Sequence, residues 1–279
     1  MSSTSGRACC KEIQLRITIK LGGSILEETG IRTHLLDQIS RIAAQGYEVI
    51  LVHGGGKSLN RRLSQMQMKS RFIEGLRVTD AETLQVAVMV LAGEVNKRIV
   101  AEMCHLGTRA LGICGADAGA VRCVRLADLP GNPDGIGFVG KPTEVNQPFF
   151  EMILGSGMVP VVSSIALGPD SQLYNVNADQ MAAACASGTH CNSLIYLTDV
   201  PGVRDGNGTI LNDIGKAEIL SMRSQGNLSG GMLPKTSSCL EAMEAGVSSV
   251  HILPGASPNI LAKFIEGSLT EGTKIHGNS

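Results

Sequence analysis

Short apolar runs rich in β-branched residues alternate along this chain with longer segments whose apolar residues have helical spacing. Successive parallel strands need a crossover connection, usually a helix, so the alternation predicts a mostly parallel sheet with helices on both faces. In open sheets of this kind, ligands bind beyond the carboxyl ends of the strands. The predicted strands are residues 15–21, 48–53, 109–114, 158–165, 193–198 and 247–253. The predicted helices are residues 31–45, 57–68, 80–106, 143–154, 178–186 and 234–245.

Two segments interrupt this alternation. Residues 119–140 hold short alternating pieces on either side of a stretch that contains Pro and Gly, which predicts a β-hairpin insertion. Residues 204–230 are rich in turn-forming residues and are predicted to be loops. No internal repeat or flexible linker is visible. We therefore expect a single domain of two lobes, at about 13–187 and about 188–279.

Charge and composition exclude several classes of protein. The formal net charge is −1, which offers no electrostatic argument for binding nucleic acid or an anionic membrane. No apolar run is long enough to span a bilayer and no secretory signal is visible, so we expect a cytoplasmic protein. The chain has 8 Cys but no Cys-x-x-Cys pair, which argues against a zinc or iron–sulfur site. We predict no protein-bound metal.

Two glycine-rich loops follow apolar runs. One is the triplet at residues 54–56, and the other is the pair at residues 22–23. A Walker A loop needs a Gly five positions before its final Gly, and that position is Leu51, so the common P-loop is excluded. A glycine loop between a strand and a helix still aims backbone N–H groups and the positive end of a helix dipole at an anion. Two such loops in one sheet indicate a site for more than one anionic group.

Three cationic side chains are candidates for such a site. Lys20 ends a predicted strand beside a glycine turn, where its ammonium could reach a phosphate; the alternative is a solvent-exposed Lys. Arg77 lies on a loop before a long predicted helix, where it could clamp a carboxylate or simply be solvated. Lys235 lies at the start of a predicted helix, where a positive charge opposes the helix dipole. A locally unfavourable placement of this kind favours a functional role.

Polar residues also alternate with apolar ones just ahead of the predicted helix at 178–186. Asn175, Asn177 and Asp179 would lie on one side of an extended chain, and Asn177 is suited to cap the helix. Capping explains Asn177 without a function. Three polar side chains beyond the carboxyl ends of the strands are also suited to orient a ligand and a cation.

A series of motifs carries a family resemblance. In order, they are KLGGS at 20–24, VHGGG at 52–56, GLRVTDAET at 75–83, LAGEVNK at 91–97, PVVSSI at 160–165, NVNADQ at 175–180, LTDVPGV at 197–203 and GGMLPK at 230–235. This ordered set resembles the amino acid kinase family over residues 15–275. Several members share VHGGG, but the combination of GLRVT with NVNAD is more specific. The ordered set of motifs is most similar to that of the family members that phosphorylate N-acetyl-L-glutamate in arginine biosynthesis.

The resemblance implies both an architecture and its ligands. The implied fold is a three-layer αβα sandwich with a mostly parallel central sheet, the carbamate kinase-like fold. The N-terminal lobe would bind the amino-acid substrate and form the dimer, and the C-terminal lobe would bind ATP. Mg²⁺ would be bound through the nucleotide.

The resemblance also implies a role for each matching residue. Lys20 and Lys235 correspond to the lysines that stabilise the transferring phosphoryl group, and Asp179 corresponds to the carboxylate that positions them. Arg77 and Asn175 correspond to residues that hold the α-carboxylate and neighbouring groups of the substrate. The residues implied to face the γ-phosphate and the substrate are Gly55 and Gly56. The residues implied to contact the nucleotide are Gly22, Gly23, Asp199, Gly202, Val203, Arg204, Gly230 and Met232.

Several alternatives stay open at this point. A sister kinase could act on another carboxylate, such as a carrier-bound aminoadipate. A non-catalytic amino-acid sensor could use the same fold, although it would not need both lysines, Asp179 and two glycine loops. A Rossmann dehydrogenase is disfavoured because no Gly-x-Gly-x-x-Gly follows the first predicted strand.

The sequence also leads to an expectation about assembly. Arginine-inhibited members of the resembling family carry an N-terminal helix that links dimers into a hexamer. Only residues 1–14 precede the first predicted strand here, and residues 1–6 have a poor helical pattern. We therefore expect a homodimer that arginine does not inhibit.

Overall fold

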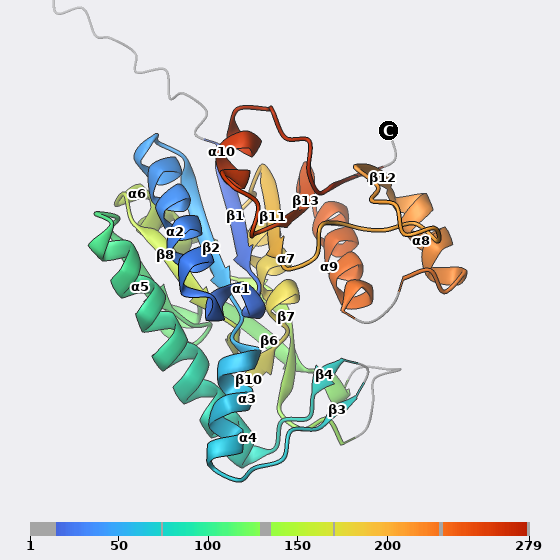
Figure 1. Ribbon diagram of the computed structural model, residues 1–279. Coiled ribbons are helices and arrows are strands. Elements are labelled where there is room, and N and C mark those ends of the chain that lie inside the picture. Colours follow the sequence, from blue (N-terminus) through green and yellow to red (C-terminus); the bar gives the residue numbers. More distant parts are fainter. Residues whose placement is uncertain (1–14, 74, 129–134, 170, 229–230, 278–279) are drawn as a thin grey trace, which may run out of the picture.

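A central sheet runs through the protein (Figure 1). Its strands are β1 (Arg16–Leu21), β2 (Glu48–His53), β5 (Ala110–Ile113), β8 (Val159–Ser163), β11 (Ser193–Thr198), β12 (Asp213–Gly215), β13 (Ser249–Pro254) and β14 (Thr273–His276). They are ordered β12-β14-β13-β11-β1-β2-β8-β5. Each neighbouring pair is parallel except β13 with β14, which is antiparallel. The predicted mostly parallel sheet is confirmed.

This computed structural model describes residues 15–73, 75–128, 135–169, 171–228 and 231–277. The expectations for residues 1–14 and for Gly230 lie outside the described residues. Among the helices described, none combines the length and the apolar character needed to cross a membrane.

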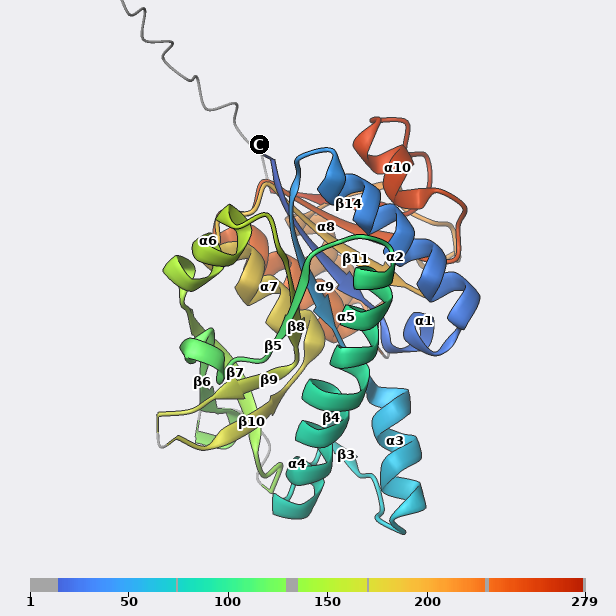
Figure 2. The same ribbon diagram turned by 90° about the vertical axis from the view of Figure 1, so that its left-hand side faces the viewer.

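Helices cover both faces of the sheet (Figures 1 and 2). They are α1 (Gly23–Glu27), α2 (Thr29–Ala44), α3 (Gly56–Gln65), α4 (Ala81–Val88), α5 (Asn96–His105), α6 (Gln147–Gly155), α7 (Ala178–Gly188), α8 (Lys216–Ser224), α9 (Met232–Glu244) and α10 (Ile260–Ile265). One face packs against α2, α5 and α10, and the other packs against α6, α7, α8 and α9. The predicted three-layer αβα arrangement is confirmed.

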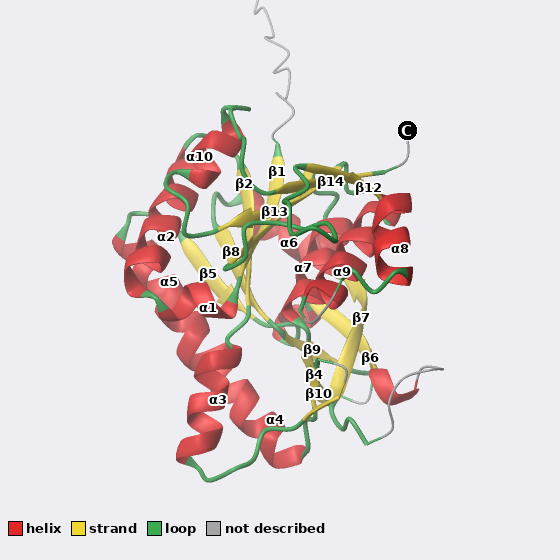
Figure 3. Ribbon diagram, turned by 45° about the vertical axis from the view of Figure 1, so that its right-hand side comes forward, coloured by secondary structure: helices red, strands yellow, loops and turns green. Residues whose placement is uncertain are grey.

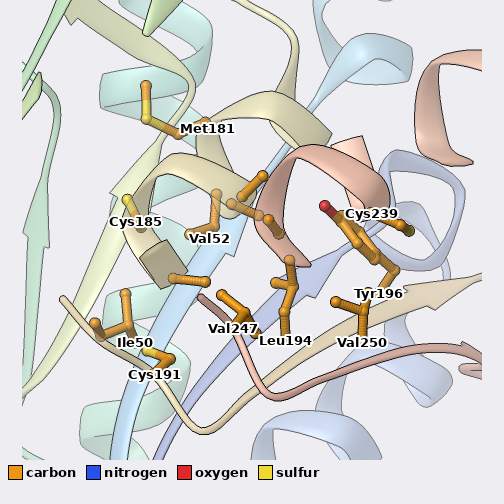
Figure 4. Close-up of a cluster of buried hydrophobic side chains, with 14 of the residues drawn as sticks. Ile50, Val52, Met181, Cys185, Cys191, Leu194, Tyr196, Cys239, Val247 and Val250 are labelled. Carbon is orange, nitrogen blue, oxygen red and sulfur yellow. The ribbon is translucent and has the colours of Figure 1, made fainter. Parts of the chain in front are cut away.

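Side chains of β2 show why the strands are apolar along their whole length. Successive side chains of a strand point to opposite faces of the sheet. Val49 and Leu51 accordingly belong to the hydrophobic core on one face, and Ile50 and Val52 belong to the core on the other. Figure 4 shows Ile50 and Val52 in the second of these cores, which also contains Tyr196 of β11. A strand that is covered on both faces has no polar side, so its sequence is a continuous apolar run.

The hairpin insertion predicted for residues 119–140 is confirmed, but its second strand is longer than expected. Strands β6 (Val121–Arg125) and β7 (Val139–Val145) pair in an antiparallel manner. The helix predicted from residue 143 therefore begins only at Gln147, where Asn146 caps it by accepting a hydrogen bond from the Phe149 N–H. The sequence pattern missed this boundary because pairing with β6 holds residues 143–145 in extended form.

The run predicted as one strand at 158–165 is divided. Strand β8 ends at Ser163, and β9 (Ile165–Leu167) leaves the central sheet to join a small four-stranded barrel with β6, β7 and β10 (Leu173–Val176). Figure 3 shows this barrel with α3 and α4 at one end of the molecule. The barrel brings the end of β10, and hence the start of α7, to the carboxyl edge of the central sheet.

The prediction that residues 204–230 are loops is wrong for part of the segment, which contains β12 and α8. Ile214, Ile219 and Met222 from these two elements are buried in the core beside α9. Turn residues on either side hid this short pattern. A further short hairpin, β3 (Phe72–Ile73) with β4 (Leu76–Arg77), precedes the long helix predicted at 80–106. That helix consists of α4, a π-helical segment (Met89–Val95) and α5.

Candidate active site

Lys20, Asp179 and Lys235 form a buried cluster at the carboxyl edge of the sheet. Nζ of Lys20 lies 2.8 Å from Oδ1 of Asp179, and Nζ of Lys235 lies 2.9 Å from Oδ2. These residues come from the end of β1 and from the first turns of α7 and α9. Each is no more than 8% exposed. A single carboxylate therefore holds two ammonium groups side by side.

The electrostatic balance of this cluster favours an anion. Burial alone would raise the pKa of Asp179, but the charges of Lys20 and Lys235, together with their hydrogen bonds, lower it to about 2. Burial lowers the pKa of Lys20, the charge of Asp179 opposes that change, and the charge of Lys235 reinforces it. With both lysines protonated, two positive charges face one negative charge. An incoming phosphate would supply the missing negative charge.

Tyr196 contacts two members of this cluster, Asp179 and Lys235. Its hydroxyl donates a hydrogen bond of 3.2 Å to the backbone carbonyl of Asp179. Its ring centroid lies 5.2 Å from Nζ of Lys235, within the range of a cation–π contact. Sequence reasoning did not identify Tyr196, because within an apolar strand it has the pattern of a core residue.

The two glycine loops lie against each other. Strands β1 and β2 are neighbours, so the loops that follow them share one edge of the sheet. A Cβ built on Gly23 would lie 3.4 Å from the backbone N of Gly56. A Cβ on Gly55 would lie 2.6 Å from Cδ2 of Leu91, so a larger residue does not fit there without a shift. Absence of side chains thus lets the two backbone segments approach closely.

Gly22 and Gly23 differ in what their N–H groups contact. The Gly22 N–H donates to the backbone carbonyl of Leu197 at 3.0 Å, so it already has an acceptor. Gly23 is the first residue of α1, where backbone N–H groups have no acceptor within the helix. Of these two N–H groups, that of Gly23 has no acceptor within its helix, while Gly22 permits close packing of the loop on β11.

His53 and Asn96 fix the start of the glycine triplet, and sequence reasoning missed both. The His53 ring is fully buried; its Nδ1 lies 2.7 Å from the Gly54 carbonyl oxygen and its Nε2 lies 3.0 Å from Nδ2 of Asn96. The Asn96 amide also donates to the carbonyl of Val161 at 2.8 Å. A neutral ring that donates from Nδ1 and accepts at Nε2 satisfies both contacts. The position of His53 directly before three glycines was the available signal.

The stability of the protein is expected to depend on pH through His53. Burial lowers the pKa of His53 to about 4, although the hydrogen bond to Gly54 opposes the change. The unfolded value is about 6.5, so between these two pH values the unfolded chain binds a proton that the folded chain does not. The stabilising contribution of neutral His53 is complete above pH ~6.5 and is lost as the pH falls towards ~4, by up to ~1.4 kcal/mol per pH unit.

Urea unfolding of the wild type and of His53→Asn at about pH 7, 5.5 and 4.5 checks this dependence. The variant should be less stable at neutral pH but should lose less stability on acidification. The exposed His34 provides the matched control, as His34→Asn. Equal acid sensitivity of His53→Asn and the wild type would contradict the assignment.

A second group of residues surrounds a pocket of about 160 Å³ beside the glycine triplet. Arg77 and Asn175 line it together with Gly55 and Gly56. The Arg77 guanidinium donates to Oδ1 of Asn60 at 2.6 Å and to the Ser70 hydroxyl at 2.7 Å. None of the ion pairs found among the described residues involves Arg77. Its positive charge is thus held at the pocket by neutral acceptors, which leaves it available to an anionic ligand.

Thr79 connects Asn175 with the Arg77 segment. The Asn175 amide donates to the Thr79 hydroxyl at 3.2 Å, and that hydroxyl donates to the Arg77 carbonyl at 2.9 Å. Asn177 caps α7 by accepting from the N–H groups of Asp179 and Gln180, as the sequence predicted. The cap fixes the first turn of α7 and with it the position of Asp179.

The remaining residues implied to bind a nucleotide lie near β11 and α9. They differ in exposure and in their hydrogen bonds. The Asp199 carboxylate accepts a hydrogen bond from Ser24, which lowers its pKa, and Arg204 is exposed. Gly202 packs closely on Thr273, and Met232 begins α9. The Val203 side chain is fully buried, its N–H donates to the Thr273 hydroxyl, and its carbonyl accepts from the Leu211 N–H. Of the polar groups of Val203, the carbonyl oxygen keeps a second lone pair for a nucleotide donor.

The arrangement suits transfer of an anionic group between two anionic partners. Gly23 lies against the glycine triplet, and the triplet also lines the Arg77 pocket together with Asn177 and Ala178, which directly precede Asp179. Within the described part of the chain, no group of three or more His, Cys, Asp or Glu side chains is placed to hold a metal ion. Lys20 and Lys235 supply positive charge at this edge.

Comparison with known sequences finds a family profile that matches most of the chain. Residues 16–254 match the sequence profile of the Amino acid kinase family. The acetylglutamate kinase of Koribacter versatilis is 41% identical over 262 residues, covering 94% of this chain and 98% of the relative. The acetylglutamate kinase of Acidobacterium capsulatum is 42% identical over 261 residues, covering 94% of this chain and 99% of the relative.

Comparison with solved structures agrees on the fold. A Streptococcus mutans protein superposes with a TM-score of 0.78 at 26% identity, covering 94% of this chain and 98% of that chain. Carbamate kinase from Giardia lamblia, solved with AMP-PNP, superposes with a TM-score of 0.69 at 15% identity, covering 95% and 99% of the two chains. At such low identity the second likeness concerns the fold alone.

Proposed function

The chain belongs to the amino acid kinase family, and on this premise we propose that it transfers the γ-phosphoryl group of ATP to the γ-carboxylate of N-acetyl-L-glutamate. The products would be ADP and N-acetyl-L-glutamyl 5-phosphate, in a step of arginine biosynthesis. The observation that carries the proposal is the Asp179 carboxylate holding Lys20 and Lys235 beside two glycine loops and the Arg77 pocket.

The nucleophile would be the substrate's own carboxylate. A carboxyl group with an ordinary pKa of about 4.3 is ionised at neutral pH, so the reaction needs no general base. His53 is the histidine nearest to the glycine triplet in sequence, and both of its ring nitrogens contact the scaffold. Its role is therefore to hold the loop and not to move a proton.

The barrier to this reaction is repulsion between the carboxylate and the phosphates, and catalysis offsets it through positioning and positive charge. Lys20 and Lys235 would stabilise the charge on the transferring group, and Asp179 keeps the two ammonium groups together. The Gly23 and Gly56 segments bring backbone N–H groups to the same point. Mg²⁺ bound through ATP would neutralise part of the phosphate charge.

The pocket beside the glycine triplet would hold the amino-acid substrate. Arg77 would pair with the α-carboxylate through its guanidinium, and Asn175 would contact a neighbouring polar group. Leu91 and Val139 also line this pocket and offer an apolar surface to the acetyl group. The γ-carboxylate would then face Gly55 and Gly56, towards the lysine pair.

The remaining assignments complete the proposal. ATP would bind across the C-terminal lobe, at about 188–279, through Asp199, Gly202, Arg204, Gly230 and Met232. The N-terminal lobe, at about 13–187, would bind the amino acid and form the contact of a cytoplasmic homodimer. Light scattering with and without arginine tests the assembly. A dimer that arginine does not affect should have the same mass in both measurements.

A substrate panel tests the proposed reaction. ADP release in the presence of MgATP is measured with N-acetyl-L-glutamate, L-glutamate, L-aspartate and carbamate. Only the acetylated substrate should support rapid turnover, since the pocket offers an apolar lining in addition to Arg77. Faster turnover with a different acceptor would identify a sister kinase. ATP-independent binding without turnover of any acceptor would favour a sensor.

Replacing Arg77 should weaken binding of the amino acid specifically. Arg77→Ala is expected to raise KM for N-acetyl-L-glutamate about a hundredfold, because a charge-assisted bidentate pair is lost. KM for MgATP should change little. The exposed Arg71 on the same hairpin is the control, as Arg71→Ala. An unchanged KM for the amino acid in Arg77→Ala would remove Arg77 from the carboxylate site.

A further inference from the structure

Asn60 contacts the Arg77 guanidinium from a helix that begins at the glycine triplet. Its Oδ1 lies 2.6 Å from Nη2 of Arg77, while the Ser70 hydroxyl lies 2.7 Å from Nη1. The Phe72 ring lies on the face of the same guanidinium, 4.7 Å from Cζ to the ring centroid. The guanidinium is therefore held along two edges and on one face.

Helix α3 connects this contact with the phosphoryl-transfer end of the site. The helix starts at Gly56, and Asn60 follows one helical turn later. Leu59 and Leu63 on the same helix are at most 2% exposed, so α3 is packed firmly on the core. A rigid helix that carries both a loop glycine and the Arg77 contact sets the distance between the two ends of the substrate site.

Asn60 leaves Arg77 able to bind a ligand. A guanidinium has five N–H donors, and the Asn60 and Ser70 bonds use one from each terminal nitrogen. Both acceptors are neutral, so the positive charge of Arg77 is not compensated by either of them. Asn60 is exposed and does not line the pocket, so it acts on the substrate through its contact with Arg77.

We propose that Asn60 is a positioning residue for the acceptor substrate: it orients Arg77 towards the α-carboxylate and ties that contact to the glycine triplet through α3. The proposal rests on the proposed function, since it assumes that Arg77 binds the α-carboxylate. Asn60 would act on recognition of the acceptor and not on the nucleotide.

Steady-state kinetics of Asn60→Ala test the proposal. KM for N-acetyl-L-glutamate should rise about tenfold, because one hydrogen bond to a charged group is lost, and KM for MgATP should stay within about twofold. Ser64→Ala provides the matched control, because Ser64 is exposed on the same helix. A general disturbance of α3 would raise both KM values, which would overturn the proposal.

Two further measurements separate positioning from a structural effect. With 4-acetamidobutyrate, which lacks the α-carboxylate but keeps the reacting one, Asn60→Ala and the wild type should have the same kcat/KM. In a double-mutant cycle with N-acetyl-L-glutamate, Asn60→Ala should add less than about twofold to the loss caused by Arg77→Ala. If the fold-losses of the two single variants instead multiply in the double variant, the substitutions act independently and the proposal is overturned. This holds even if turnover of the truncated substrate is too slow to measure.

The wild type distinguishes failure of the proposal from failure of the proposed function. If the wild type does not phosphorylate N-acetyl-L-glutamate, the assigned substrate is wrong. If the wild type does so and Asn60→Ala has an unchanged KM, only the role of Asn60 is wrong.

Discussion

Alanine at position 20 or at position 235 is expected to reduce kcat about a hundredfold or more, since each change removes a preorganised positive charge that stabilises the transferring phosphoryl group. In the structure, both ammonium groups lie within 2.9 Å of the Asp179 carboxylate and are aimed at the same edge of the sheet. Loss of one lysine leaves the other still paired with Asp179. The fold should therefore persist, and KM for N-acetyl-L-glutamate should change much less than kcat.

Measurement of kcat at saturating MgATP and N-acetyl-L-glutamate checks Lys20→Ala and Lys235→Ala, with thermal unfolding to show that each variant is folded. Lys57→Ala is the matched control, because Lys57 is exposed in the first turn of α3 next to the glycine triplet. Its kcat should remain within about twofold of the wild type. Near-normal turnover in either buried-lysine variant would show that its assigned role is wrong.

Asp179→Asn should damage both activity and stability. An amide of the same size cannot neutralise Lys20 and Lys235, which are buried and adjacent. Removing one partner of a buried ion pair costs about 3–5 kcal/mol, because the remaining charge is left uncompensated. We expect kcat to fall at least about a hundredfold, since a lysine that loses its proton no longer stabilises the phosphoryl group.

The stability of Asp179→Asn should depend on pH, and Lys20 sets the direction of the change. Burial lowers the pKa of Lys20, and removing the Asp179 charge removes an interaction that opposes that change. Between the lowered folded pKa and the unfolded value of about 10.4, the unfolded chain binds more protons than the folded chain. The stability of Asp179→Asn should therefore rise relative to the wild type as the pH increases above neutral.

Urea unfolding at several pH values between about 7 and 9.5 measures this difference. The control is Asp37→Asn, because Asp37 forms an ion pair of 2.9 Å with Arg41 on the surface of α2. An exposed pair of this kind contributes at most about 1 kcal/mol. If Asp179→Asn is as stable as Asp37→Asn and keeps its turnover, Asp179 does not hold the two lysines in the way that the structure indicates.

The sequence predicted most of the central sheet correctly because the inner strands are covered on both faces. A continuous apolar run with a turn at each end is a local signal, and it located β1, β2, β5, β11 and β13 to within a few residues. The same reasoning failed where pairing with a distant strand decided the conformation. Residues 143–145 are extended only because they pair with β6, and β9 leaves the sheet to join the barrel.

Local chemistry also predicted parts of the site. Asn177 was identified as a helix cap from its position before small residues, and the structure confirms that cap. The positions of the two glycine loops and of Lys235 in a first helical turn were visible in the same way. The bond from Val203 to Thr273 was not visible in the sequence, because the two residues are 70 positions apart.

The sequence by itself therefore determined the elements, their apolar faces, the glycine loops at the strand ends and the family resemblance, because these depend on periodicity and on short motifs. Only the tertiary structure decided which side chains meet. It buried His53 under the glycine triplet, joined Asn60 to Arg77, and gave the distances from Asp179 to Lys20 and Lys235, whose pairing the resemblance alone had implied. Such contacts depend on strand order and on how helices pack across the sheet, which a local pattern along the chain does not contain.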